Sequence, residues 1–150
     1  MSIILLVIIL GLLIVLFIFH KKLFILNSSM SVKDSKLVDG QKGLFAEKKY
    51  KENDVIDMCP TIKILHSNID PSSRLNDYVF QSINDEGYVL VSMGYCGMMN
   101  HSEEKQNATW AIDKEDESIK MYAIRDIEPG EEFYVNYGDE YWNERGMTAI

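Results

Sequence analysis

Apolar residues are distributed very unevenly along this 150-residue chain. Residues 3–19 are apolar without exception, and at about 1.5 Å per helical residue they cover roughly 25 Å, enough for a bilayer span. No charged side chain precedes this run and no Ala-x-Ala-like site follows it, which favours a retained membrane anchor over a cleaved signal peptide. Lys21 and Lys22 follow at once. By the positive-inside rule, we expect a single-pass membrane protein whose soluble domain faces the cytosol.

Beyond the anchor, the pattern changes to short apolar runs and alternations. Residues 20–35 are predicted to be a linker, because the polar and small-residue stretch NSSMSVKDSK begins at Asn27. Apolar and polar side chains alternate with a period of two over residues 119–123 and 133–137, as is typical of half-buried strands. Further short apolar runs predict strands at residues 44–46, 55–58 and 88–91, and one short helix is expected at residues 75–83. The pattern therefore predicts an all-β or β-rich domain over residues 36–142, followed by a C-terminal tail at 143–150.

The charge of the chain narrows its set of partners. The formal net charge is -8, and every Asp and Glu lies at or beyond Asp34. An acidic domain is a poor match for nucleic acid, because affinity for phosphates depends on Lys and Arg. It suits a Lys- and Arg-rich protein or peptide, although an acidic surface also serves solubility alone.

The chain contains two cysteines, Cys59 and Cys96, in separate parts of the sequence. A structural zinc site usually needs four clustered ligands with a Cys-x-x-Cys pair, and none is present, so we expect no metal. Two isolated thiols are also not expected to form a disulfide framework, and a reducing compartment is the default inference.

Three segments carry candidate chemistry. Residues 39–46 (DGQKGLFA) place two glycines before a strand, where the backbone can approach a ligand closely or simply turn. Residues 94–102 (GYCGMMNHS), followed by Asn107 and Ala108, contain residue types that turn a chain and satisfy its backbone. Residues 127–142 (IEPGEEFYVNYGDEYW) end with aromatic residues that fit either a narrow aromatic site or the edge of a core.

Together, and in this order, the three segments resemble those of the SET-domain protein-lysine methyltransferases. The matching parts are the glycine motif before Leu-Phe-Ala, the Asn-His-Ser with its downstream Asn-Ala, and the Gly-Glu-Glu turn leading to Tyr-Gly-Asp. The likeness covers about residues 36–142 and is closest to compact viral SET proteins, which lack flanking cysteine clusters. It implies an all-β SET fold of small sheets whose C-terminal segment passes beneath a loop. It also implies S-adenosyl-L-methionine as cofactor and a lysine on a basic protein tail as substrate, either a histone or a membrane-proximal or virion protein.

The resemblance also assigns roles to single residues. Tyr137 matches the active-site tyrosine of the family, and Tyr95 and Val135 match its substrate channel. The positions matching cofactor-binding residues are Lys42, Gly43, Leu44, Tyr78, Asn100, His101 and Trp142. Two positions depart from the pattern. Gln41 stands where many members have a second glycine, and Cys59 precedes Pro60 where some relatives have another channel tyrosine.

Two other interpretations remain open from the sequence. Gln41 favours a non-catalytic, membrane-tethered interaction protein that keeps the SET fold without turnover. A membrane-anchored structural protein with coincidental motifs is the third interpretation. It predicts no pocket joining Asn100, Tyr78 and Tyr137.

Overall fold

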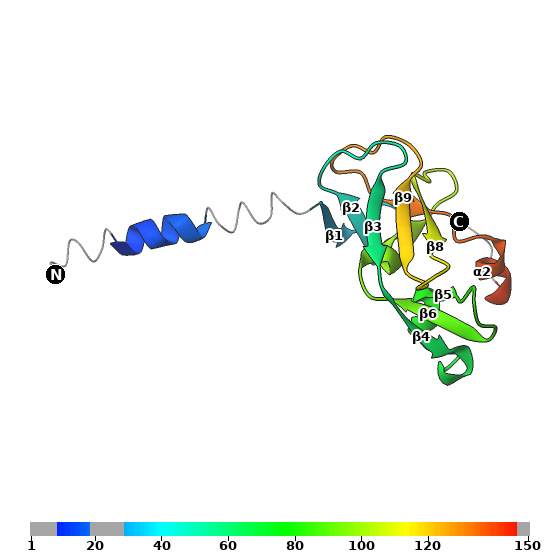
Figure 1. Ribbon diagram of the computed structural model, residues 1–150. Coiled ribbons are helices and arrows are strands. Elements are labelled where there is room, and N and C mark those ends of the chain that lie inside the picture. Colours follow the sequence, from blue (N-terminus) through cyan, green and yellow to red (C-terminus); the bar gives the residue numbers. More distant parts are fainter. Residues whose placement is uncertain (1–8, 19–28, 147–150) are drawn as a thin grey trace.

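The structure is a computed structural model that describes residues 9–18 and 29–146 (Figure 1). Residues 9–18 are helical. Among the described residues, no helix combines the length and the apolar character that a membrane crossing requires. The expected anchor at residues 3–19 extends beyond the described residues at both ends, so it stays a prediction.

Short strands dominate residues 29–146 and form four small sheets in this part of the chain (Figure 1). The first two sheets pair β1 (Met30–Asp34) with β2 (Lys42–Ala46), and β10 (Tyr134–Val135) with β7 (Asn100–His101). The third has the order β3 (Val55–Cys59), β9 (Ile119–Ala123), β8 (Ala108–Ile112). The fourth has the order β4 (Thr61–Leu65), β6 (Tyr88–Ser92), β5 (Val79–Gln81). The β-rich fold expected from the alternation is confirmed.

The helical elements of residues 29–146 are short. They are the 3-10 helices η1 (His66–Asn68), η2 (Arg74–Tyr78) and η3 (Tyr95–Met98) and the α-helix α2 (Asp139–Glu144). The helix expected at residues 75–83 is therefore corrected, since η2 ends at Tyr78 and Val79–Gln81 form β5. The reason is tertiary, because β5 pairs with β6 in register and so satisfies its backbone in a sheet.

Both expected flanks of the domain also need correction. Residues 30–34, placed in the linker by their polar composition, form β1 and pair antiparallel with β2 along all five positions. This pairing covers the edge of β2, whose backbone groups would otherwise lack partners. At the other end, α2 continues through Glu144, so the expected boundary between domain and tail at 142/143 falls inside a helix.

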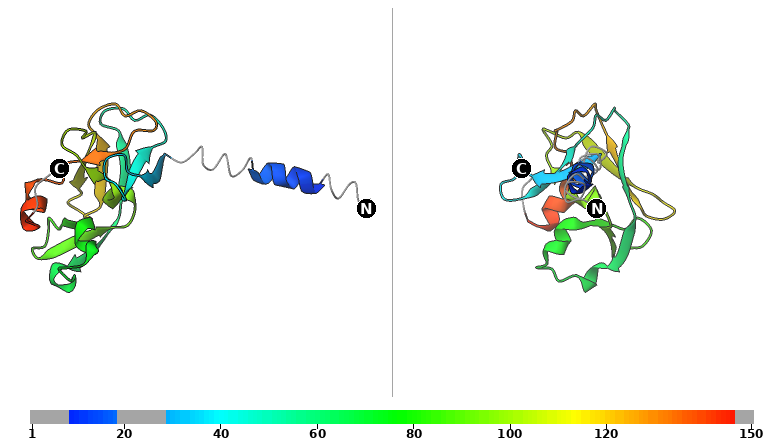
Figure 2. Two further views of the ribbon diagram at one scale, coloured as in Figure 1. Left: turned by 180° about the vertical axis from the view of Figure 1, so that it is seen from behind. Right: turned by 90° about the vertical axis from the view of Figure 1, so that its left-hand side faces the viewer.

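The core lies around η3. This helix contacts β2, β3, β6 and β9, and its Cys96 belongs to the main apolar cluster. Tyr50 and Phe133 meet edge to face with their ring centroids 5.5 Å apart, and both are almost fully buried. The β4-β6-β5 sheet lies at one end of the folded part, drawn in green in Figure 2. Because η3 packs against four strands, the position of the Asn-His-Ser segment that follows it is well fixed.

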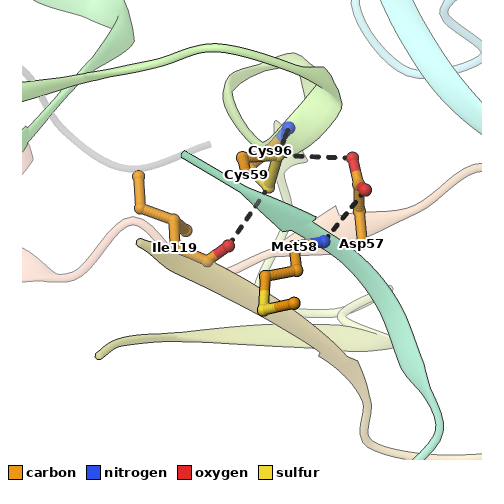
Figure 3. The surroundings of a disulfide bond; sticks show 5 residues. All are labelled: Asp57, Met58, Cys59, Cys96 and Ile119. Atoms are coloured by element: carbon orange, nitrogen blue, oxygen red, sulfur yellow. Dashed lines mark hydrogen bonds between the residues drawn. A yellow bond between two sulfur atoms is a disulfide. The ribbon is translucent and has the colours of Figure 1, made fainter. Parts of the chain in front are cut away.

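Cys59 and Cys96 form a disulfide, which corrects the expectation of two separate thiols (Figure 3). The bond joins the end of β3 to η3 across 37 residues of sequence, and both cysteines are at most 2% exposed. The backbone N–H of Cys96 donates to Cys59 Sγ at 3.2 Å. Asp57 Oδ2 lies 3.3 Å from Cys59 Sγ, close enough for a shared metal site, but disulfide sulfurs are not thiolate ligands. The cysteines therefore give no argument for a reducing compartment.

Candidate active site

The second and third motifs lie side by side. β7 and β10 pair in parallel, with Asn100 opposite Tyr134 and His101 opposite Val135. Asn107 reinforces the contact, since its Nδ2 donates to the Glu132 carbonyl at 2.8 Å and its Oδ1 accepts from the Tyr134 N–H at 2.9 Å. The Asn-His-Ser turn and the strand that leads to Tyr-Gly-Asp are therefore neighbours, as the resemblance requires.

The first motif meets the third on the opposite side. The Phe133 N–H donates to the Leu44 carbonyl at 2.8 Å, and the Ala46 N–H donates to the Glu131 carbonyl at 2.9 Å. The C-terminal segment thus runs between β2 and β7. This is where a segment passing beneath a loop would lie, and the threading itself stays a prediction.

Glu132 joins all three motifs through its buried carboxylate. It accepts hydrogen bonds from Asn100 Nδ2 at 2.9 Å, from the Lys36 N–H at 2.7 Å and from the Tyr134 hydroxyl at 2.7 Å. Burial acts to raise the pKa of Glu132, but the hydrogen bonds from Lys36, Asn100 and Tyr134 outweigh it and hold the pKa below its usual range. Gly43 packs against the same carboxylate, because a Cβ at that position would lie 2.1 Å from Glu132 Oε1. The glycine is therefore required by packing in this structure.

Tyr137 stands at the centre of the candidate site. Its hydroxyl donates to the Met99 carbonyl at 2.9 Å, and its backbone N–H donates to His101 Nδ1 at 3.2 Å. Its ring lies 4.6 Å from the Tyr141 ring and stacks on Trp142 at 6.0 Å between centroids. Burial, followed by the nearby phenols and Asp77, raises the pKa of the Tyr137 hydroxyl. Tyr137 is therefore a neutral phenol at physiological pH.

Two cavities meet at Tyr137. The first, here called the histidine cavity, has a volume of about 440 Å³ and includes the backbone turn at Gly40. Its further lining residues are Val38, Gln41, Lys42, Arg74, Asp77, Tyr78, Gly97, Met98, Met99, Asn100, His101, Tyr137, Tyr141, Trp142 and Arg145. The second, here called the aromatic cavity, has a volume of about 430 Å³ and is bounded by Phe80, Trp110 and Val135.

The two cavities share part of their walls. The residues that line both are Asp77, Tyr78, Gly97, Met99, Tyr137, Tyr141 and Arg145. The aromatic cavity also carries the carboxylates of Asp139, Glu140 and Glu144, so its lining is acidic overall. This arrangement offers one ligand a polar, partly basic chamber and another ligand an acidic, aromatic chamber, with a neutral phenol between them.

Most of the site residues assigned from the sequence border these cavities. Lys42, Tyr78, Asn100, His101 and Trp142 line the histidine cavity, and Val135 lines the aromatic cavity. Three others, Gly43, Leu44 and Tyr95, line neither cavity. Leu44 is fully buried in the core, Gly43 faces Glu132, and Tyr95 begins η3 with 45% of its surface exposed.

Sequence reasoning assigned no site role to five residues that line both cavities, namely Asp77, Gly97, Met99, Tyr141 and Arg145. Met99 contributes its carbonyl, which a side-chain motif does not reveal. Tyr141 was noted only as part of an aromatic cluster, and Arg145 lies in the expected tail. Tyr141 and Arg145 are placed by α2, a helix too short to show a helical period in the sequence.

A sequence model of the SET domain matches residues 41–138, about two thirds of the chain. The chain belongs to the SET-domain family. A histone-lysine N-methyltransferase of Schizosaccharomyces pombe, specific for histone H3 lysine 37, is 24% identical over 123 residues, which are 80% of each protein. The SET-domain assignment and the small β-rich fold are thus confirmed, while the expected likeness to viral members stays a prediction.

Solved structures agree with this SET fold. A Plasmodium falciparum protein described as a candidate histone methyltransferase matches with a TM-score of 0.65 and 28% identity, over 77% of this chain and 98% of that one. A Chaetomium thermophilum polycomb repressive complex 2 structure, bound to S-adenosylmethionine, matches with a TM-score of 0.62 and 24% identity. That match covers 79% of this chain and 17% of the other. At 24% identity, this match supports the fold alone.

SET methyltransferases use S-adenosylmethionine, and the residues of the histidine cavity fit such a molecule. Among residues 9–18 and 29–146, His101 Nε2 and Trp142 Nε1 are buried and find no hydrogen-bond partner, although both residues line the cavity. Because His101 Nδ1 accepts a hydrogen bond from the Tyr137 N–H, a neutral His101 carries its proton on Nε2. Two N–H donors therefore lack acceptors at this wall, and an adenosine with its ring nitrogens and hydroxyls supplies them.

Proposed function

We propose that this chain is a protein-lysine N-methyltransferase that uses S-adenosyl-L-methionine. The observation that carries the proposal is the meeting of the histidine and aromatic cavities at Tyr137. A methyl donor in one cavity and a lysine side chain in the other would approach each other beside this phenol. The family and the methyltransferase relatives support the same reaction.

The histidine cavity would hold the cofactor. Asn100 is fixed by its bonds to Glu132 and to the Lys42 carbonyl, so β7 presents a rigid backbone to the ligand. His101 and Trp142 meet edge to face at 4.9 Å and would close over the adenosine. When bound, the cofactor supplies a methyl group on a sulfonium that leaves as a neutral thioether.

Tyr137 would align the amine. Because its proton is donated to the Met99 carbonyl, its phenol oxygen remains an acceptor for an N–H of the lysine. Its raised pKa excludes Tyr137 as the base. The lysine has a reference pKa near 10.4 and must lose its proton. The apolar walls of Phe80 and Trp110 desolvate the amine and lower its pKa, which favours that loss. The chain therefore contributes alignment and electrostatics.

The substrate we propose is a lysine on a basic protein tail, such as a histone tail or a basic membrane-proximal or virion protein. The net charge of -8 and the carboxylates along the aromatic cavity support a cationic partner and argue against direct nucleic-acid binding. Val135, two residues before Tyr137, lies in this wall and would contact the lysine stem.

We further propose that residues 3–19 anchor the protein in a membrane as a single-pass span, with the SET domain facing the cytosol. The apolar run and the two lysines that follow it support this orientation. In that compartment the glutathione pool would keep Cys59 and Cys96 reduced, so trapping their thiol state from cells tests the orientation. Because both cysteines are buried, the cells are lysed in denaturant with the alkylating reagent. Alkylation of both cysteines is expected, whereas a protected disulfide would place the domain in an oxidising compartment.

The activity test incubates the full-length chain with methyl-labelled S-adenosylmethionine and a panel of basic proteins. Label is expected on lysine, with a strong loss in Tyr137→Phe. Tyr122→Phe is the matched control, because Tyr122 lies on β9 and lines neither cavity. If wild type and Tyr137→Phe label every protein to the same extent, the catalytic proposal fails.

One observation favours a second candidate, a non-catalytic interaction protein with the SET fold. Gln41 lines the histidine cavity at a position where many family members have glycine. Calorimetry with S-adenosylhomocysteine separates the two functions. Saturable binding supports the enzyme, and its absence in the folded full-length chain supports the interaction protein.

A further inference from the structure

Arg145, the residue after α2, contacts two separate elements with one side chain. Its Nη1 donates to the Tyr141 carbonyl of α2 at 3.0 Å, and its Nη2 donates to the Asn76 carbonyl in η2. Its guanidinium carbon lies 3.8 Å from the centre of the Tyr141 ring, and Nε lies 3.6 Å from Asp77 Oδ1. The guanidinium therefore bridges α2 and η2, which are 69 residues apart at the bonded positions.

The strength of this bridge comes from geometry more than from charge. The Asp77 side chain is 47% exposed, and ion pairs in such a setting contribute little. The two carbonyl bonds and the stacking on Tyr141 use the planar, many-donor shape of a guanidinium, which an ammonium cannot reproduce. The Arg145 side chain is only 22% exposed, so these contacts are partly shielded from water.

The bridge matters because α2 has little stability of its own. A six-residue helix is far too short to persist in isolation, and α2 follows Gly138, whose φ of +84° turns the chain sharply. In the described part of the chain, α2 contacts the domain through Tyr141, which meets the Tyr137 ring, through Trp142 and through the adjacent Arg145. Trp142 is buried against His101, and Arg145 reaches η2.

The elements that Arg145 joins form walls of both cavities. α2 contributes Tyr141 and Trp142, η2 contributes Asp77 and Tyr78, and Arg145 itself borders both cavities. Separation of α2 from η2 would open the histidine and aromatic cavities to each other and to solvent at this corner.

We propose that Arg145 is a positioning residue that clamps α2 onto η2 and thereby sets the wall shared by the two cavities. The inference rests on the proposed function for its effect on ligands, and on the contacts alone for its effect on α2. Arg145 reaches Tyr137 indirectly, through the ring of Tyr141, so it changes binding more than the rate of the methyl transfer.

The test compares Arg145→Ala and Arg145→Lys with the wild-type full-length chain. Arg125→Ala is the matched control, because Arg125 pairs with Glu131 on the surface and lines neither cavity. Three quantities are measured: amide hydrogen exchange of the peptide spanning residues 139–146, the Kd of S-adenosylhomocysteine, and kcat and KM for a labelled lysine peptide.

Arg145→Ala is expected to speed exchange in α2 about tenfold and to raise the Kd and the peptide KM by about the same factor, which matches the loss of one charge-assisted hydrogen bond. The kcat at saturation should fall less than about threefold, because positioning is restored by bound ligand. Arg145→Lys should resemble Arg145→Ala, since one ammonium cannot span two carbonyls.

Three results would overturn the clamp. One is a lower melting temperature in Arg145→Ala with unchanged exchange in α2 and unchanged Kd, which indicates a merely structural arginine. The second is full restoration by Arg145→Lys, which indicates that charge alone acts. The third is an equal effect of Arg125→Ala. A wild-type chain that neither binds S-adenosylhomocysteine nor transfers methyl groups refutes the proposed function instead, and the exchange data still decide the clamp.

Discussion

The backbone N–H of Tyr137 donates a hydrogen bond to Nδ1 of His101 at 3.2 Å. This bond joins the third motif to the second across 36 residues and requires Nδ1 to be unprotonated. Burial lowers the pKa of His101, which favours the same neutral form. The position of Tyr137 therefore depends on the protonation state of His101.

Acidification should weaken cofactor binding through this histidine. Because the folded pKa of His101 lies below its ordinary value of 6.5, the neutral form is favoured above pH 6.5, and its contribution to stability falls as pH drops through the folded pKa. The Kd of S-adenosylhomocysteine, measured by calorimetry from pH 8 to pH 5, should rise on the acid side. His101→Asn should flatten this pH dependence. If the Kd of that variant changes with pH as much as the wild-type Kd does, the pH dependence comes from another group.

Substitution of Gly43 by alanine should destabilise the domain. The new Cβ would lie 2.1 Å from Glu132 Oε1 and 3.2 Å from Asn100 Nδ2, within a buried network in which several hydrogen bonds hold the carboxylate. We expect a loss of about 1–3 kcal/mol in the free energy of unfolding, as for other overpacked sites. Gly97→Ala is the matched control, since a Cβ at that position would lie 3.8 Å from its nearest neighbour, the Tyr78 carbonyl oxygen. Equal effects of the two variants in urea melts would contradict the packing argument.

Glu117 should make the fold acid-sensitive. Its side chain is 4% exposed, pairs with Lys63, and accepts hydrogen bonds from Ser82 Oγ at 2.6 Å and the Asn84 N–H at 3.2 Å. The Lys63 and Ser82 hydrogen bonds lower the pKa of Glu117 from 4.5 to about 2. A lowered pKa stabilises the fold above pH 4.5, and this stabilisation is lost as pH falls toward 2.

A Glu117→Gln variant should therefore lose less stability than wild type between pH 5 and pH 2, as followed by circular dichroism melts. Glu128→Gln serves as control, because Glu128 is exposed and pairs with Lys49 on the surface. If wild type and Glu117→Gln lose the same stability between pH 5 and pH 2, another carboxylate causes the acid sensitivity.

Reduction of the disulfide should destabilise the domain and loosen η3. Closing a loop of 37 residues is worth about 4 kcal/mol in the chain-entropy description. The melting temperature of wild type should fall on addition of dithiothreitol, whereas the double variant Cys59→Ala, Cys96→Ala should not respond. Because η3 leads into Met99, the reduced protein should also bind S-adenosylhomocysteine more weakly. A wild-type melting temperature that dithiothreitol leaves unchanged would contradict this account.

The sequence predicted those parts of the molecule that depend on local pattern or on a family motif. Period-two alternation located β9, and the motifs brought Asn100, His101 and Tyr137 to one site. Features that depend on partners far along the chain were missed. β1 is a strand because β2 offers it an edge, and Cys59 meets Cys96 because β3 and η3 pack together.

The candidate site shows the same division. The motif residues border the cavities, whereas the junction between them also needs the Met99 carbonyl and the Arg145 side chain. A backbone carbonyl carries no sequence signal, and Arg145 follows a helix too short to show a period. Neither position was visible before the chain was folded.

The central claim is that Tyr137 aligns a lysine amine at the junction of the two cavities. Single-turnover methyl transfer tests it most directly, with full-length protein saturated with S-adenosylmethionine and mixed with a lysine peptide. We expect Tyr137→Phe to slow transfer about a hundredfold, as for loss of one positioned polar group, with the cofactor Kd unchanged and Tyr122→Phe at the wild-type rate. A Tyr137→Phe variant that transfers the methyl group as fast as wild type would contradict the account.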